Sequence, residues 1–140
     1  MITYFVSSAA GWIAVILAAF EIALPYWLRR VSPLQASALP ARHSSPYLRS
    51  MWPHYWLGYL LVALSLGHAF AVMETPLGRA KVEGIWAATG ALVLLFLQLS
   101  LGLYLQTAVG RNRRLLKRCH FWGMLSFAGL LIWHIALNAA

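Results

Sequence analysis

The sequence is short of charged residues, and shortest of acidic ones. Only 10% of its 140 residues are charged, against roughly a quarter in an ordinary soluble domain, and just three are acidic. Hydrophobic residues make up 61% of the chain, and the mean hydropathy is +0.70. This composition excludes an ordinary water-soluble domain and indicates an integral membrane protein. Because only short segments remain outside the long apolar runs, we expect no soluble catalytic domain in them.

Cysteine is almost missing as well. Cys119 is the only one, which excludes an intrachain disulfide framework and a Cys-x-x-Cys metal site. We interpret it as a small packing residue rather than a redox thiol.

Positive charge gathers in two segments. Eleven Lys and Arg residues against three acids give a formal net charge of +8. The segment 29–49 is rich in Ser and Pro and carries Arg29, Arg30, Arg42 and Arg49, so we expect an extended polar loop there. The segment 111–118 carries five more basic residues and no acid. Basic loops of this kind fix the orientation of a membrane protein, and we therefore expect no nucleic-acid partner.

Four stretches are long enough and apolar enough to cross a membrane. The segments 1–20, 50–73, 84–110 and 119–140 contain no Asp, Glu, Lys or Arg. A bilayer core of about 30 Å needs about 20 such residues, so we predict helices at about 3–24, 53–73, 84–106 and 118–138. No Lys or Arg precedes the first stretch, which argues against a removed signal peptide. The predicted fold is an all-α membrane protein, a four-helix bundle forming one transmembrane domain over residues 1–140.

The charge distribution also predicts an orientation. Nine of the 11 basic residues belong to the two basic segments, whereas the connection 74–83 balances Glu74 and Glu83 against Arg79 and Lys81. The positive-inside rule places the basic segments in the cytoplasm and both termini outside it. The seven tryptophans fall mostly near predicted helix ends, as in an interfacial aromatic belt. We expect the chain in a bacterial inner (cytoplasmic) membrane.

Histidines recur with one spacing in two of the predicted helices. His54 and His68 lie on the second, His120 and His134 on the fourth, and each pair is 14 residues apart. Fourteen residues return to within about 40° of the starting direction and climb about 21 Å, so each pair shares a helix face at two depths. Two histidines so far apart cannot bind the same metal ion. His43 falls in the polar loop, where we expect a solvated side chain.

The second and fourth helices run in the same direction. His54 therefore lies at the same depth as His120, and His68 at the same depth as His134. Two facing imidazoles on parallel helices supply the axial ligands of a haem iron, and we predict two bis-histidine haems b enclosed by the bundle. Covalent attachment is excluded, because Cys119-His120 lacks the upstream cysteine of a Cys-x-x-Cys-His motif. Glycines that would admit a flat macrocycle are Gly11, Gly58, Gly67, Gly90, Gly102, Gly123 and Gly129.

A bland interpretation stands beside this one. A single histidine in a transmembrane helix often only hydrogen-bonds a neighbour or lines a polar pathway. Four histidines at matched depths and equal spacing favour ligands. The openings His54-Tyr55-Trp56 and His120-Phe121-Trp122 also resemble one another, as expected of a duplicated two-helix unit.

With His-x13-His on its second and its fourth helix, the chain resembles the four-helix diheme core of membrane cytochromes b. That family includes the cytochrome b of quinol–cytochrome c reductases and small quinone-linked cytochrome b subunits. The resemblance implies electron transfer across the membrane through two haems b, with His54, His68, His120 and His134 as axial ligands. The respiratory protein has further helices that build its quinol-oxidation site, and this sequence has no counterpart of them.

Few residues suit quinone or proton chemistry. The candidates are Glu21, near the cytoplasmic end of the first helix, and Glu74, just past the second. An acid after twenty uncharged residues is costly unless it is paired or functional, and snorkelling toward Arg29 or Arg30 is the alternative. We expect the basic residues before His120 to make the haem on that side modestly easier to reduce.

Three functions compete. The favoured one is a diheme subunit that passes electrons between the quinone pool and a partner oxidoreductase, with other subunits of a membrane redox complex and membrane lipids as partners. The second is a free-standing small quinol-dependent reductase. The third is a non-redox module in which the histidines conduct protons or pack an assembly.

Overall fold

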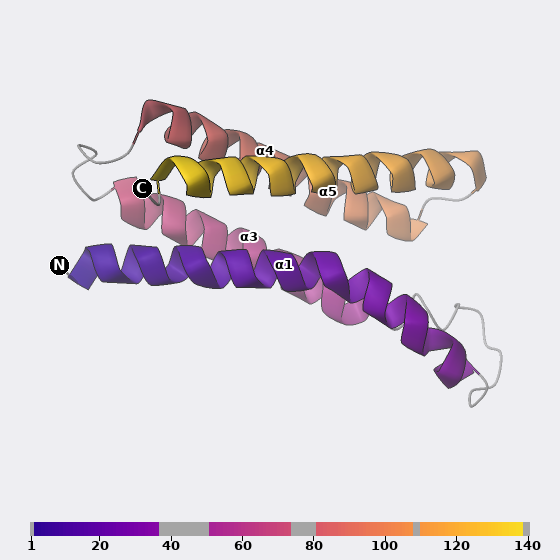
Figure 1. Ribbon diagram of the computed structural model, residues 1–140. Helices are drawn as coiled ribbons and strands as arrows, with labels where there is room; N and C mark the ends of the chain where they lie inside the picture. The colour runs from indigo at the N-terminus through magenta and orange to yellow at the C-terminus, as the bar shows by residue number, and fades with distance from the viewer. Residues whose placement is uncertain (1, 37–50, 74–80, 108–109, 139–140) are drawn as a thin grey trace.

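The chain is a set of long helices joined by short connections (Figure 1). The computed structural model describes residues 2–36, 51–73, 81–107 and 110–138. Of these, every residue except Met51 and Lys81 is helical. The helices are α1 (Ile2–Ala36), α3 (Trp52–Met73), α4 (Val82–Thr107) and α5 (Gly110–Asn138).

Each of the four helices contains a segment long and apolar enough to span a bilayer. These segments are Ser8–Arg30, Trp52–Met73, Val82–Thr107 and Arg111–Asn138. The predicted all-α fold, with four helices long and apolar enough to span a membrane, is thereby confirmed. Large apolar side chains are widely exposed along the helices, among them all seven tryptophans. Such a surface suits lipid rather than water as its surroundings.

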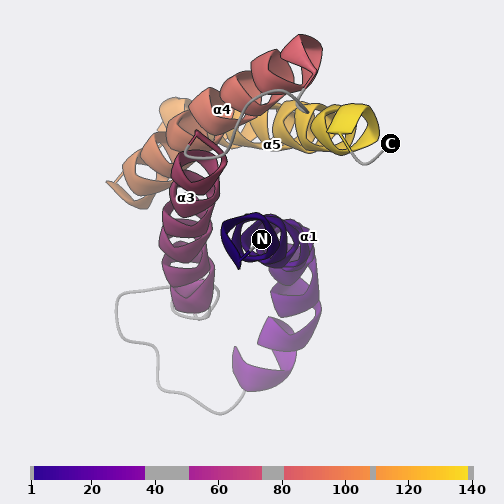
Figure 2. The same cartoon turned by 90° about the vertical axis from the view of Figure 1, so that its left-hand side faces the viewer.

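Two helices extend further than the sequence indicated. Helix α1 continues past residue 24 to Ala36, so Arg29 and Arg30 lie on a helix and not in a loop. Its second half bends away from the first (Figures 1 and 2). Pro25 accounts for a bend there, because it cannot donate to the carbonyl of Glu21 and its ring crowds the preceding turn.

Helix α5 begins at Gly110 rather than near 118. The basic segment 111–118 is therefore helical, which reflects the good helix propensity of its Arg, Lys and Leu residues. Its positive charges are carried on an extension of the membrane helix.

The helices associate as two antiparallel pairs. Helix α1 packs chiefly on α3 and α4 chiefly on α5, while α3 and α4 make the main contact between the pairs. Seen along the bundle, α3 lies next to α4 (Figure 2). This pairing is the one expected of a duplicated two-helix unit. The described ends of α1 and α5 nearest the termini lie at the same end of the bundle, and the basic parts of α1 and α5 lie at the other (Figure 1).

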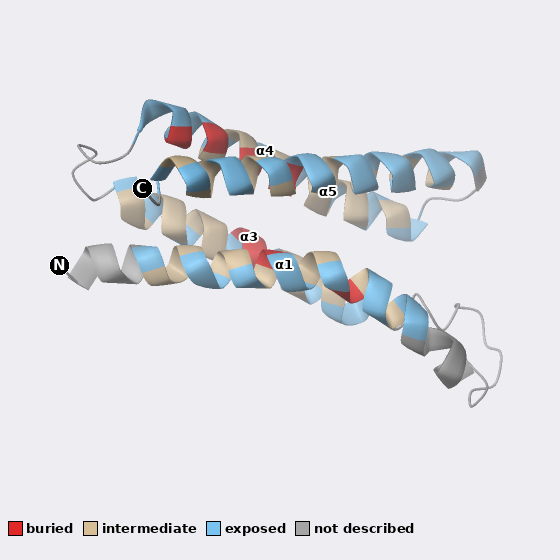
Figure 3. Ribbon diagram, in the orientation of Figure 1, coloured by how far each residue is buried: buried red, intermediate tan, exposed pale blue. Residues whose placement is uncertain are grey.

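All four helices contribute to a small core in the middle of the bundle (Figure 3). Its buried members are Ala18, Leu61, Val62, Ala91, Leu95 and Phe127. Leu61 lies midway between the two histidines of α3, and Phe127 lies midway between those of α5. Seven residues make almost two full helical turns, so Leu61 and Phe127 share a face with the histidines above and below them. Along the bundle axis, the core therefore lies between His54 and His120 toward the basic end and His68 and His134 toward the end that carries the termini. We call these two positions along the axis the two levels.

Candidate functional site

Helices α3 and α5 each carry two of the four histidines, one in the first half of the helix and one near its end. His54 lies in the first turn of α3, where Pro53 is tolerated because the first N–H groups of a helix have no internal partner. His68 lies near the end of the same helix. On α5, the extra basic turns place His120 well inside the helix, and His134 lies close to its end. Every one of the four side chains is partly buried.

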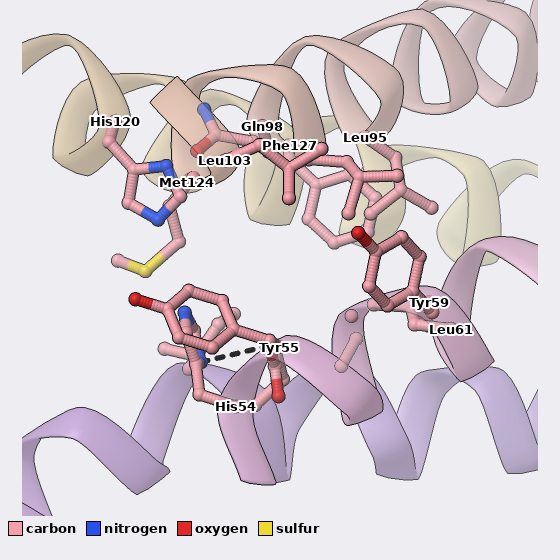
Figure 4. Close-up of a pocket in the computed structure, with 16 residues that line it drawn as sticks. His54, Tyr55, Tyr59, Leu61, Leu95, Gln98, Leu103, His120, Met124 and Phe127 are labelled. Carbon is pink, nitrogen blue, oxygen red and sulfur yellow. Dashed lines mark ion pairs between the residues drawn. The ribbon is translucent and has the colours of Figure 1, made fainter. Parts of the chain in front are cut away.

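His54 and His120 come together, as their predicted depth requires. Their ring centroids are 6.3 Å apart and the rings are nearly perpendicular, at 80°. Figure 4 shows the rings turned toward one another across a gap between α3 and α5. No other described helix passes between them.

This separation is suited to a shared metal centre. Two imidazoles on opposite sides of one metal ion have centroids about 6 Å apart, since each metal–nitrogen bond is about 2 Å and each centroid lies about 1 Å further back. Among the described residues, no three His, Cys, Asp or Glu side chains converge on one point. Two facing imidazoles suit an iron whose other four ligands belong to a macrocycle.

Glu21 of α1 lies against the Nδ1 side of the His54 ring. Its Oε1 atom lies 2.8 Å from His54 Nδ1, and the two side chains are only 13% and 17% exposed. Neither Nδ1 of His54 nor Oε2 of Glu21 makes a hydrogen bond of normal angle within the described part of the chain. The atoms are thus at hydrogen-bond distance, and a small turn of the imidazole ring would align its N–H with the carboxylate. Among the described residues Glu21 forms its ion pair with His54 and not with Arg29 or Arg30, the alternative partners.

Gln98 of α4 meets His120 in a similar way. With its NH2 group toward α5, the amide donates to His120 Nδ1 at 2.7 Å and to the His120 carbonyl at 3.0 Å. Its oxygen then accepts from the Met124 N–H at 3.1 Å. In this arrangement Nδ1 accepts, so the ring proton of neutral His120 lies on Nε2. A metal at Nε2 would therefore require the amide to turn over and present its oxygen to Nδ1–H. Gly123 makes room for this amide, because a Cβ there would collide with the end of the Gln98 side chain.

A cavity surrounds this histidine pair. Its volume is about 90 Å³, and it is open on part of its surface. All four helices line it, mostly with apolar side chains. The residues that line it are Ala18, Glu21, Ile22, His54, Tyr55, Gly58, Tyr59, Leu61, Leu95, Gln98, Leu99, Gly102, Leu103, His120, Met124 and Phe127.

His68 and His134 lie near the ends of α3 and α5, and each lies against a helix of its own pair. A Cβ on Gly11 of α1 would lie 2.9 Å from His68 Cε1, so the glycine allows the ring to pack against the α1 backbone. His134 Nδ1 lies 2.9 Å from the carbonyl oxygen of Gly84 on α4. If Nδ1 donates to this carbonyl, Nε2 carries the free lone pair that a metal requires.

The two helix pairs use the same plan. In each pair, the first helix brings a polar side chain to the histidine near the basic end and a glycine to the histidine near the termini. Glu21 and Gly11 do this from α1, and Gln98 and Gly84 do it from α4. Sequence reasoning missed Gln98, although an amide inside so apolar a helix was a visible signal.

Two of the sequence-based assignments fall outside the described residues. Glu74, the second candidate for quinone or proton chemistry, and His43 both lie there. Cys119, which we interpreted as a packing residue, is exposed on α5.

Comparison with known proteins finds no relative of this chain. No protein-family model, no curated protein and no solved structure matches the chain. A function must therefore be inferred from the residues of the site.

Proposed function

We propose that this chain is a diheme membrane cytochrome b that carries electrons across the membrane. His54 and His120 would be the axial ligands of one haem b, and His68 and His134 those of the other. The observation that carries the proposal is the facing pair His54 and His120, with ring centroids 6.3 Å apart inside a cavity. Haem iron, once bound, supplies one-electron chemistry at each level.

The neighbours of the histidines support this role. Metal-bound histidines usually donate their second ring N–H to a carboxylate or a backbone carbonyl, which fixes the tautomer and the ring orientation. Glu21 is placed to accept from His54 in this way, and the Gly84 carbonyl from His134.

The rest of the bundle suits transfer between the two levels. The ligands on each helix are separated by about 21 Å along its axis, and flat macrocycles extending from them would approach more closely. Leu61 and Phe127 fill the space between the levels and exclude water from it. An apolar filling of this kind keeps the two sites distinct within one low-dielectric bundle.

We further propose that the chain works as a subunit. The described helices contain no domain for a flavin, an iron–sulfur cluster or a soluble substrate, and in this proposal electrons would come from the quinone pool and pass to a partner oxidoreductase. The basic parts of α1 and α5 would face the cytoplasm of a bacterial inner membrane, where an acidic subunit or anionic lipid could dock.

Reconstitution into sealed vesicles tests the proposal. Vesicles containing the purified full chain and trapped ferricyanide should reduce it when a membrane-impermeant reductant is added outside. Vesicles with the variant His54→Ala/His134→Ala, which lacks a ligand at both levels, should not. Equal rates for the two proteins would reject transmembrane electron transfer and leave the non-redox module.

Purification in mild detergent separates the two redox alternatives. The subunit proposal predicts other redox proteins in stoichiometric amounts with the chain. Isolation of the chain alone, still oxidising quinol and reducing a small acceptor at an enzymatic rate, would replace it with the free-standing reductase.

A further inference from the structure

The two helix pairs differ in charge at equivalent places. His54 and His120 are the histidines nearest the basic end. The carboxylate of Glu21 on α1 lies against His54, whereas the neutral amide of Gln98 on α4 lies against His120. Glu21 is also the one acidic residue in the middle of a described span, since Glu83 lies exposed in the first turn of α4. An acid at this depth is costly unless it has a partner or a function.

Gly58 and His54 of α3 surround the carboxylate of Glu21. Its Oε1 atom would lie 3.5 Å from a Cβ on Gly58, one turn after His54, so the carboxylate rests directly on the α3 backbone. Among the described residues, the ring nitrogen that Oε1 approaches is Nδ1 of His54, at 2.8 Å. The opposite ring nitrogen is the one that faces His120 across the cavity (Figure 4).

We propose that Glu21 is a positioning residue that holds His54 as its Nδ1–H tautomer and lowers the reduction potential of the haem held by His54 and His120. The second part rests on the proposed function. Accepting the Nδ1–H leaves Nε2 unprotonated and aimed at the metal position, and it makes the imidazole a more electron-rich ligand.

The sign of the effect follows from charge. Reducing a haem iron removes one positive charge from the centre, so a nearby carboxylate favours the oxidised form. Glu21 is largely buried and is therefore weakly screened. The five basic residues of the segment 111–118 lie at the exposed start of α5, with Arg113 the most covered of them. Lys117 and Arg118 are near His120 in the sequence, but their exposed charges act through solvent of high dielectric constant, whereas the carboxylate is largely buried, so the carboxylate outweighs them.

This reverses the order of the two haems expected from the sequence. The basic residues alone would make the haem at the basic end the easier one to reduce. With Glu21 against its ligand, that haem becomes the poorer electron acceptor of the two. Electrons would then pass more favourably from the basic end toward the end that carries the termini.

Redox titration in the background His134→Ala isolates the relevant haem, because this variant retains only the pair His54 and His120. The added change Glu21→Gln places at this site the residue type that α4 already uses. It should shift the equilibrium toward the reduced haem at least about tenfold, which is about 59 mV for one electron. The matched control Glu83→Gln removes the same charge from the opposite end and should leave the potential unchanged. A haem retained in Glu21→Gln with an unshifted potential would overturn the proposal.

A second measurement needs no haem. Nitrogen NMR of the full-length apoprotein labelled at histidine, with the His54 signals identified by their loss in His54→Gln, should show the proton on Nδ1. In Glu21→Leu, which removes the acceptor, it should move to Nε2. A proton on Nε2 in the unaltered chain would overturn the proposal even if the protein binds both haems. Absence of haem from the unaltered chain would instead reject the proposed function, and the NMR result would still decide the role of Glu21.

Discussion

The imidazole rings of His54 and His120 face one another from parallel helices, although a whole transmembrane span separates them in the sequence. Their centroid separation of 6.3 Å leaves room for one metal ion between two nitrogens and little else in line. Each ring has a polar neighbour on its far side, Glu21 for His54 and Gln98 for His120. These four side chains come from four different helices, so the site depends on the whole bundle.

Removing one ligand should remove one haem. We expect His54→Ala and His120→Ala to lose the same haem, and His68→Ala and His134→Ala to lose the other, because each pair occupies one level. Haem quantified per polypeptide, together with helical circular dichroism as a control for folding, measures this. Loss of both haems from folded His68→Ala, or an experimental structure that pairs His54 with His134, would contradict the assignment by depth.

Gly11 should matter to the level of His68 and not to the other. In Gly11→Ala the new Cβ would lie 2.9 Å from His68 Cε1, which forces the ring to move. Displacing a ligand in this way should weaken haem binding there by about 10–100-fold, the usual cost of disturbing the surroundings of a metal ligand. The retained haem of His134→Ala should be unaffected by Gly11→Ala.

The matched control is Gly67→Ala, next to His68 itself. A Cβ on Gly67 would meet nothing within 4 Å, so both haems should remain. Equal haem loss from the two substitutions would mean that glycine itself, and not the space beside His68, is required.

That His54 lies beside His120 was predictable, whereas the other neighbours of these two rings were not. Helical periodicity alone determines that residues 14 apart share a face, and span order determines that α3 and α5 run in parallel. Whether Glu21 reaches His54 or snorkels to an arginine depends on how α1 packs laterally on α3, which a hydropathy pattern does not encode. The start of α5 was also missed, because a basic helical segment has the same composition as a basic loop.

Gly123 should affect the haem of His120 through Gln98. A Cβ in Gly123→Ala would occupy the place of the Gln98 amide and push it away from the imidazole. We expect weaker haem binding at this level, by about tenfold or more, and a changed potential for this haem in the His134→Ala background. Gly129→Ala on the same helix is the control, since its Cβ would meet nothing within 4 Å and should change neither quantity.

The basic ends of α1 and α5 should face the cytoplasm. The positive-inside rule then places the C-terminus on the opposite side. A reporter fused after Ala140 that is active only outside the cytoplasm should be active, and one that is active only in the cytoplasm should be silent. The reverse result would show that the charge bias had been overridden, for example by partner subunits.

The most direct test of the central claim is the haem content of the purified full chain, taken with its reduced-minus-oxidised absorption spectrum. We predict two haems b per polypeptide, both extracted by acid acetone because neither is covalently bound, with spectra of six-coordinate bis-histidine iron. A folded, membrane-inserted chain that carries no haem after expression with ample haem supply would contradict the diheme cytochrome.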